Sequence, residues 1–248
     1  MKKILKFLQI VYSIYAMLLF LLLMLIVVPF VLLSSLLGKE RGGNLVYIIC
    51  RWWAVLWYFL IFIWYKEIFL APHKKNCQYI FVGNHRSYLD IPQLMRAMHQ
   101  PVRVLGKHDL AKTPVFGIIY RAAAILVDRG SRENRAKSIS IMKAVLAKGI
   151  SIFIFPEGTF NETGKPLKDF YDGAFRIALE TGTPIKPIIF PDTLRRFHYK
   201  SIFNFTPGIC RAVYLEEIGV VDFEKGDTAA LKQKVYTEME KALKLYEK

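Results

Sequence analysis

The segment Asn-His-Arg-Ser-Tyr-Leu-Asp places a histidine and an aspartate, His85 and Asp90, five positions apart. An imidazole can take a proton from a hydroxyl group near neutral pH, and a neighbouring carboxylate can fix its tautomer. Five residues of helix turn the chain by about 500°, which would leave the two side chains on different faces. We therefore expect His85 in a turn before a helix and Asp90 in the first turn of that helix, where the two side chains meet.

The residues around this pair fit that arrangement. Residues 79–82 are typical of a short buried strand, residues 83–84 of a turn, and Pro92 of a first helical turn. Taken alone, the pair has simpler explanations, namely a hydrogen-bonded histidine at a strand end and an aspartate that caps a helix. A metal site is disfavoured, because no second histidine or cysteine lies at ligand spacing.

A second candidate segment, Phe-Pro-Glu-Gly-Thr, follows at residues 155–159. It closes an apolar run at residues 152–154, where proline stops the strand ladder and glycine lets a ligand approach the backbone. Glu157, Gly158 and Thr159 are therefore candidates for contact with a substrate. The alternative is an ordinary turn after a strand, with a solvated glutamate.

Two basic residues, Lys107 and Arg129, each follow another predicted strand. In α/β sheets, ligands bind in the crevice at the carboxyl ends of the strands, so both side chains are candidates for that crevice. A lysine and an arginine there suit a phosphate group, which arginine binds with two hydrogen bonds and lysine as a point charge. The alternative is a pair of solvated surface charges.

The N-terminal part of the chain is apolar enough to enter a bilayer. Residues 7–37 carry no charged side chain, and as a helix they would span about 46 Å against a hydrocarbon core of roughly 30 Å. A second apolar stretch at residues 45–65 contains all four tryptophans, which favour the headgroup boundary, together with Arg51. We expect residues 1–65 to form a two-helix membrane anchor within one leaflet, with Pro29 allowing the first helix to bend. Two full spans are the alternative.

The chain is basic, with 35 Lys and Arg residues against 20 Asp and Glu residues and a formal net charge of +15. Most of this excess lies beyond residue 65, which favours anionic lipid and phosphorylated or acidic substrates as partners. Nucleic acid is disfavoured, because the chain has no zinc spacing, RNP-like aromatic motif or basic repeat. The cysteines, Cys50, Cys77 and Cys210, show neither disulfide nor metal spacing, which fits a reducing cytosolic face.

Beyond residue 65, short apolar runs alternate with amphipathic stretches, which predicts an α/β fold with a central sheet covered by helices. Strands are expected at residues 78–83, 102–105, 123–127, 151–155, 185–190 and 210–215. Helices are expected at residues 88–99, 109–120, 132–148, 171–181 and 227–246. We therefore predict that residues 66–248 form a single catalytic domain behind the membrane anchor.

The order of four segments resembles the motif blocks of the glycerolipid acyltransferase family over roughly residues 66–215. The segments are Asn-His-x4-Asp, the strand before Arg129, Phe-Pro-Glu-Gly-Thr and Pro-Ile-Lys-Pro-Ile. Residues 170–175 also match the family's Phe-x-x-Gly-Ala-Phe stretch. Two residues depart from the pattern: Phe160 stands where the family usually has an arginine, and Lys186 stands where it usually has an apolar residue.

This resemblance implies that an acyl group moves from acyl-CoA or acyl carrier protein to the sn-2 hydroxyl of lysophosphatidic acid (1-acylglycerol-3-phosphate), giving phosphatidic acid for phospholipid biosynthesis. It implies His85 as the general base and Asp90 as the residue that orients it. Lys107 and Arg129 would bind the acceptor's phosphate, and residues 157–159 would position its glycerol part.

The same resemblance implies no metal and no resident cofactor, with membrane lipid as a partner. It places the chain on the inner (cytoplasmic) membrane, with the catalytic domain on the cytoplasmic face. Two other functions stay open. One is an acyltransferase that uses glycerol-3-phosphate or another lysophospholipid, because Phe160 removes an expected cation from the acceptor side. The other is a non-catalytic membrane adaptor with a basic surface, which the intact His85 and Asp90 disfavour.

Overall fold

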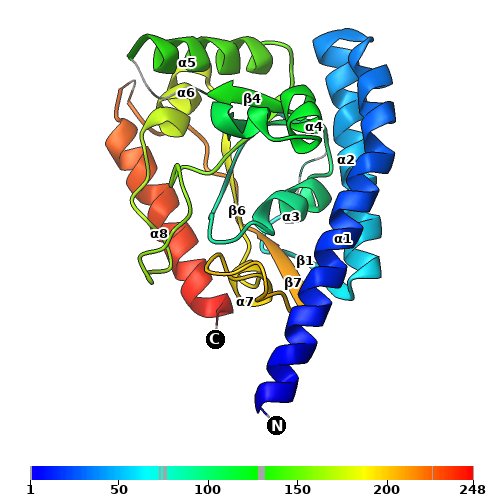
Figure 1. Ribbon diagram of the computed structural model, residues 1–248. Helices are drawn as coiled ribbons and strands as arrows, with labels where there is room; N and C mark the ends of the chain where they lie inside the picture. Colours follow the sequence, from blue (N-terminus) through cyan, green and yellow to red (C-terminus); the bar gives the residue numbers. More distant parts are fainter. Residues whose placement is uncertain (1, 73, 75–76, 128–131, 225, 248) are drawn as a thin grey trace.

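The computed structural model describes residues 2–72, 74, 77–127, 132–224 and 226–247, and Figure 1 shows a sheet with helices on both faces. The strands are β1 (Ile63–Phe69), β2 (Ile80–Gly83), β3 (Val102–Lys107), β4 (Ala124–Val127), β5 (Ser151–Ile154), β6 (Ile185–Ile189) and β7 (Gly208–Tyr214). The helices are α1 (Lys2–Ser35), α2 (Gly43–Leu60), α3 (Asp90–Ala97), α4 (Phe116–Ala123), α5 (Arg132–Leu146), α6 (Gly173–Thr181), α7 (Thr193–Arg196) and α8 (Thr228–Tyr246), with short helical turns η1 (Gly38–Gly42) and η2 (His108–Lys112). This architecture confirms the predicted α/β fold.

The described strands form one seven-stranded sheet in the order β1-β7-β6-β2-β5-β3-β4. Neighbouring strands run parallel except at β6 and β7, where Ile188 pairs with Tyr214 in antiparallel register. The strands β3, β5, β2 and β6 therefore all end at one edge of the sheet. The loops after β2 and β5, which carry the histidine and glutamate segments, are neighbours at that edge.

Alternate residues of the central strands face two different apolar layers, as the two-residue period of a strand requires. Ile80 and Val82 of β2 pack with α5, α6 and α8, whereas Phe81 packs with α2 and α3. In Figure 1, α5, α6 and α8 cover one face of the sheet and the first four helices cover the other. Burial on both faces explains why these strands are continuous apolar runs.

The helices α1 and α2 form a hairpin that lies along the face of the sheet opposite to α5, α6 and α8 (Figure 1). α1 continues through Pro29, and the Trp57 Nε1 group of α2 donates to the carbonyl oxygen of Ala16 at 3.0 Å. Large apolar side chains point outward from both helices, among them Leu25 and Phe59. By length and composition, both helices are apolar enough to cross a membrane.

The turn of this hairpin is tied to the sheet domain. The Arg103 Nη2 group of β3 donates to the carbonyl oxygens of Lys39 and Glu40, each at 3.1 Å. The same group donates to Asn44 Oδ1 at 2.9 Å, and Lys148 forms an ion pair with the Glu40 carboxylate. The turn therefore lies beside the domain, and the hairpin does not point away from it.

The end of the hairpin differs from the prediction. The second apolar stretch is expected to stay helical through residue 65, but α2 ends at Leu60 and β1 begins at Ile63. Phe62 has a φ of 55°, which stops the helix, and the residues after it pair in parallel with β7. An apolar run that becomes an edge strand cannot be told from a continuing helix by its pattern alone.

The helix predicted at residues 109–120 is also wrong, because two shorter elements, η2 and α4, replace it. Pro114 separates them: Thr113 before it is extended, with φ −66° and ψ 130°, as the residue before a proline prefers. Val115 after it has a φ of 61°, so the chain cannot continue as a helix there. The other predicted helices and strands are confirmed, with ends that differ by one or two residues.

Candidate active site

The loop after β2 brings His85 and Asp90 together, as the spacing predicts. β2 ends at Gly83 and α3 begins at Asp90, so His85 lies in the connecting turn, with its Nδ1 atom 2.9 Å from Asp90 Oδ2. The same carboxylate oxygen accepts the backbone N–H groups of Arg86 at 2.7 Å and Ser87 at 2.8 Å. The buried carboxylate therefore holds both the imidazole and the loop that carries it.

Two aromatic rings fix the orientation of the His85 imidazole. Phe155 stacks on it, with ring centroids 4.1 Å apart and planes 18° apart, and Phe160 meets it edge-on at 4.3 Å. The side chain of His85 is 16% exposed, so part of the ring reaches solvent. Because Nδ1 faces Asp90, Nε2 is the nitrogen left to act on a reacting hydroxyl group.

Glu157 joins the two segments that the sequence singles out. Its carboxylate is fully buried: Oε1 accepts the backbone N–H of His85 at 2.8 Å, and Oε2 accepts the backbone N–H of Lys168 at 2.9 Å. Burial raises the pKa of Glu157 to about 7, and the two N–H donors oppose that rise. The solvated glutamate of the simpler interpretation is therefore wrong, because this side chain is part of the frame around the imidazole.

The rest of the loop after β5 holds His85 from its other side. Gly158 has a φ of 75°, a conformation that favours glycine, where the chain turns away from the strand. The backbone N–H of Asn161 donates to the carbonyl oxygen of His85 at 2.7 Å. The Asn161 side chain orders the loop, since it donates to the Lys165 carbonyl at 2.9 Å and accepts the Thr163 N–H at 3.0 Å. The loop thus clamps His85 through both its N–H and its carbonyl group.

Thr159 lines a cavity of about 300 Å³. Lys168 Nζ donates to Thr159 Oγ1 at 2.9 Å. The ring of Phe160 lines this cavity and also contacts His85, so the cavity adjoins the candidate base. The cavity is lined by Thr159, Phe160, Glu162, Thr163 and Lys168.

The remaining predicted site residues are the two phosphate-binding cations, Lys107 and Arg129. Lys107 is the last residue of β3 and lies at the same edge of the sheet as the loop of His85. Its side chain is 71% exposed, and its Nζ atom is 3.1 Å from the Asp109 carboxylate. Arg129 falls outside the residues that the structure describes, so its place in the site stays a prediction.

The sequence places the residue before the histidine in a turn but predicts no contact for its side chain. Asn84 is fully buried; its Oδ1 atom accepts the Phe190 N–H at 2.7 Å and its Nδ2 atom donates to the Phe190 carbonyl at 3.3 Å. These bonds tie the loop after β2 to the end of β6. The position of Asn84 beside His85 was a usable signal, whereas nothing in the pattern pointed to Lys168.

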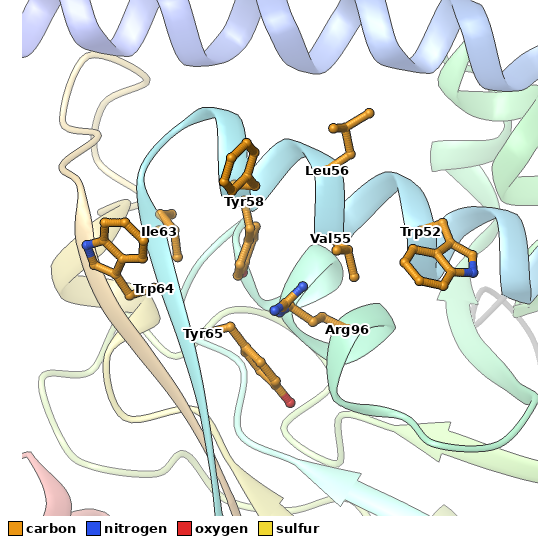
Figure 2. Close-up of a pocket in the computed structure, with 9 residues that line it drawn as sticks. Trp52, Val55, Leu56, Tyr58, Ile63, Trp64, Tyr65 and Arg96 are labelled. Carbon is orange, nitrogen blue, oxygen red and sulfur yellow. The ribbon is translucent and has the colours of Figure 1, made fainter.

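A larger and more apolar cavity, of about 580 Å³, lies between α2, β1 and α3. Figure 2 shows Trp52 and Val55 of α2 and Trp64 of β1 around it, with Arg96 of α3 among them. The Arg96 guanidinium lies over the ring of Tyr65, 4.5 Å from its centroid. Trp52 is 66% exposed, so this groove opens on the outer surface of the hairpin.

Comparison with known proteins finds similar sequences. Residues 69–191 match the family model described as Acyltransferase. The chain is 31% identical over 160 residues to the 1-acyl-sn-glycerol-3-phosphate acyltransferase of Haemophilus influenzae, covering 62% of this chain and 65% of that protein. It is also 31% identical over 157 residues to the protein of that name from Salmonella typhimurium, covering 61% of each. The chain thus spans somewhat less than two thirds of the length of these curated relatives.

The fold also has a counterpart among solved structures. The crystal structure of the 1-acyl-sn-glycerophosphate (LPA) acyltransferase PlsC from Thermotoga maritima aligns with a TM-score of 0.76 at 22% identity. The alignment covers 98% of this chain and 97% of that one, so the likeness includes the N-terminal hairpin as well as the sheet domain. At this level of identity, the likeness shows a shared fold.

Proposed function

From the match to the Acyltransferase family model and the likeness to these relatives, we propose that the chain is an acyltransferase that transfers an acyl group to the sn-2 hydroxyl of 1-acylglycerol-3-phosphate. The acyl donor is a thioester, acyl-CoA or acyl carrier protein, and the product is phosphatidic acid. The names of the relatives support this acceptor. The observation that carries the proposal in this chain is the hydrogen bond of 2.9 Å between His85 and the buried Asp90.

In the proposed reaction, Nε2 of His85 removes the proton of the acceptor hydroxyl as its oxygen attacks the carbonyl carbon of the thioester. The tetrahedral oxyanion then collapses, the C–S bond breaks, and the imidazolium gives its proton to the departing thiolate. Asp90 keeps a proton on Nδ1 and stabilises the positive ring. Because the acceptor hydroxyl itself is the nucleophile, the reaction needs no covalent acyl-enzyme, no metal and no resident cofactor.

The other predicted residues have supporting tasks in this proposal. Glu157 holds the backbone of the general base, so its effect on the acceptor is indirect. Gly158 and Thr159 lie at the turn beside the imidazole, where they would position the glycerol part. Lys107, at the same sheet edge, and Arg129 would add positive charge for the acceptor's phosphate.

We further propose that the hairpin anchors the domain in one leaflet, on the cytoplasmic face of the inner membrane. The outward apolar side chains of α1 and α2 support the anchor. The bonds from Arg103 to the hairpin turn support an arrangement in which the turn and the domain lie on the same side of the membrane. The groove of about 580 Å³ opens on the same outer surface, where it would shelter an acyl chain. Acceptor and product both carry such chains and reside in the bilayer.

The test is an acceptor panel with purified full-length protein in detergent, with thiol release as the readout. Lysophosphatidate is expected to release thiol rapidly from acyl-CoA or acyl carrier protein, and the His85→Ala variant is the control for background hydrolysis. Transfer to glycerol-3-phosphate or to another lysophospholipid, but not to lysophosphatidate, would establish the alternative acceptor. No thiol release with any acceptor would rule out the acyltransferase function.

A further inference from the structure

The loop after β5 folds back so that one lysine lines the cavity of about 300 Å³ that Phe160 separates from the candidate base. Nζ of Lys168 donates to Oγ1 of Thr159 at 2.9 Å, and the backbone N–H of Lys168 is held by the buried Glu157 at 2.9 Å. Within the described part of the chain, no carboxylate pairs with this ammonium group. The lysine is therefore fixed by its backbone, while its charge is directed at a hydroxyl group on the cavity wall.

Glu157 and Phe160 connect the loop that carries Lys168 to His85. Glu157 accepts the backbone N–H groups of both His85 and Lys168, so one carboxylate sets the two residues relative to each other. The ring of Phe160 contacts the imidazole and lines the cavity that Lys168 also lines. Phe160 carries no charge, and Lys168 is the cation that lines this cavity.

The chemistry of the acceptor requires an anion-binding group near the base. In a 1-acylglycerol-3-phosphate, only the C2–C3 and C3–O bonds separate the carbon with the reacting hydroxyl from the phosphate ester oxygen. When that hydroxyl lies at Nε2 of His85, the phosphate must therefore lie within a short distance of the imidazole. A lysine ammonium binds phosphate as a point charge, and a hydroxyl group can donate to a phosphate oxygen.

We propose that Lys168 and the Thr159 hydroxyl bind the phosphate of the acceptor in this cavity. The proposal rests on the proposed function and adds the residue that selects a phosphorylated acceptor. On binding, the ammonium group exchanges Thr159 for a phosphate oxygen, and the freed hydroxyl donates to the same phosphate. The carboxylate of Glu162 also lines the cavity and opposes the ammonium charge there, so the phosphate has to bind on the Lys168 side.

The test uses Lys168→Gln, which removes the charge, and Lys168→Arg, which keeps it. Lys165→Gln is the matched control, because Lys165 is exposed in the same loop and its side chain has no partner among the described residues. The KM for lysophosphatidate is expected to rise roughly 10- to 100-fold in Lys168→Gln, the usual loss for a hydrogen bond to a charged group. It should change little in Lys165→Gln and recover largely in Lys168→Arg, with the KM for the thioester donor unchanged in all three.

An acceptor without phosphate distinguishes a role of Lys168 in phosphate binding from a structural role of the same residue. With 1-acylglycerol, which keeps the acyl chain and the sn-2 hydroxyl but has a free sn-3 hydroxyl in place of the phosphate, wild type and Lys168→Gln should turn over equally at sn-2. If Lys168→Gln instead loses kcat on both acceptors, Lys168 acts only through Glu157 and the proposal is overturned. It is also overturned if the KM for lysophosphatidate is the same in Lys168→Gln and Lys165→Gln.

A direct titration makes the outcome independent of turnover. Glycerol-3-phosphate, added to the full-length protein in detergent and followed by calorimetry, should bind wild type and Lys165→Gln but bind Lys168→Gln at least 10-fold more weakly. If wild type does not acylate lysophosphatidate but still binds glycerol-3-phosphate through Lys168, the proposed function fails and this site stands. If wild type is active and binding does not depend on Lys168, this site fails and the proposed function stands.

Discussion

The backbone N–H of His85 donates to the buried carboxylate of Glu157 at 2.8 Å. The acid of the loop after β5 thus holds the base of the loop after β2, across two neighbouring parallel strands. A buried carboxylate with both oxygens engaged by backbone N–H groups keeps the imidazole in place without touching a reacting atom. Glu157 is therefore a positioning residue, and its effects should appear in turnover and in stability.

We expect Glu157→Gln to lower kcat by roughly 10- to 100-fold, because the amide nitrogen of glutamine cannot accept one of the two N–H groups and the base moves. Stability should respond to pH as well. The pKa of Glu157 is raised from 4.5 to about 7, so the folded protein binds a proton that the unfolded chain releases between those values. The free energy of unfolding of wild type should therefore fall as pH rises through this interval, by about 3 kcal/mol at most.

Thermal or denaturant unfolding of both proteins in detergent, between pH 4.5 and pH 7.5, measures this effect. The difference in the free energy of unfolding between wild type and Glu157→Gln separates the contribution of this glutamate from that of other groups that titrate in the same range. A difference that does not vary with pH would mean that Glu157 is ionised throughout.

His85→Ala should reduce transfer by roughly 10²- to 10⁴-fold, the usual contribution of a positioned general base. The fold should survive, because the clamp on this residue uses its backbone N–H and carbonyl groups, which alanine retains. Thiol release gives the rate, and circular dichroism with membrane co-sedimentation gives the fold and the anchor. A folded, membrane-bound His85→Ala protein with normal turnover would contradict the mechanism.

Asp90→Asn should cut kcat severely, by up to about 10⁴-fold, because an amide N–H facing Nδ1 forces the wrong tautomer on the imidazole. Leu89, and not Asp90, is the N-cap residue of α3, so loss of a helix cap is not the expected cause. The Oδ2 atom that faces Nδ1 also accepts the N–H groups of Arg86 and Ser87, so an amide group in its place leaves both N–H groups without that acceptor. The melting temperature should therefore fall as well, and a rate loss fully explained by unfolding would point to a purely structural aspartate.

The site shows which contacts a sequence can reveal. His85 and Asp90 are close in the chain, so their spacing and the turn signals around them were sufficient to predict that they meet. The bond between His85 and Glu157 joins residues on different strands, and it depends on the order β2-β5 in the sheet, which no local pattern encodes. The role of Lys168 depends in turn on that bond and on the path of an irregular loop.

The fold was predictable to a similar extent. Strands buried on both faces were recognisable as apolar runs, and the amphipathic helices by their period. The edge strand β1 was missed because Ile63 and its neighbours continue the apolar composition of α2, and only pairing with β7 makes them a strand. The break at Pro114 could have been foreseen, since a proline disfavours helix at the residue before it.

Lys186→Met should stabilise the protein by about 1–3 kcal/mol, because Lys186 is fully buried and its Nζ atom has no hydrogen-bond partner among the described residues. Burial lowers the pKa of Lys186 below its ordinary value, so the unfolded chain binds a proton that the folded chain lacks between the two values. The stability of wild type should rise with pH through that window, and Lys186→Met should not show this rise. Unfolding measured from pH 7 to pH 10 tests it, and a less stable Lys186→Met protein would reveal a needed polar contact.

The last prediction concerns the anchor. The bonds from Arg103 to Lys39 and Glu40 place the hairpin turn against the sheet domain, so the turn should stay on the domain's side of the membrane. Gly42 is unsuitable for a probe, because a Cβ atom there would lie 2.2 Å from the Ser34 carbonyl oxygen. Lys39 is exposed and serves better as the single cysteine, in a chain whose native cysteines are replaced by alanine.

An impermeant maleimide should label Lys39→Cys in inside-out membrane vesicles and leave it unlabelled in sealed right-side-out vesicles. A cysteine at Lys165, in the loop of the catalytic domain, is the matched control and should follow the same pattern. Equal accessibility of the two positions is expected because the hairpin lies within one leaflet, so that its turn and the catalytic domain are on the same side of the membrane. Labelling of Lys39→Cys, but not of Lys165→Cys, in right-side-out vesicles would establish two full spans.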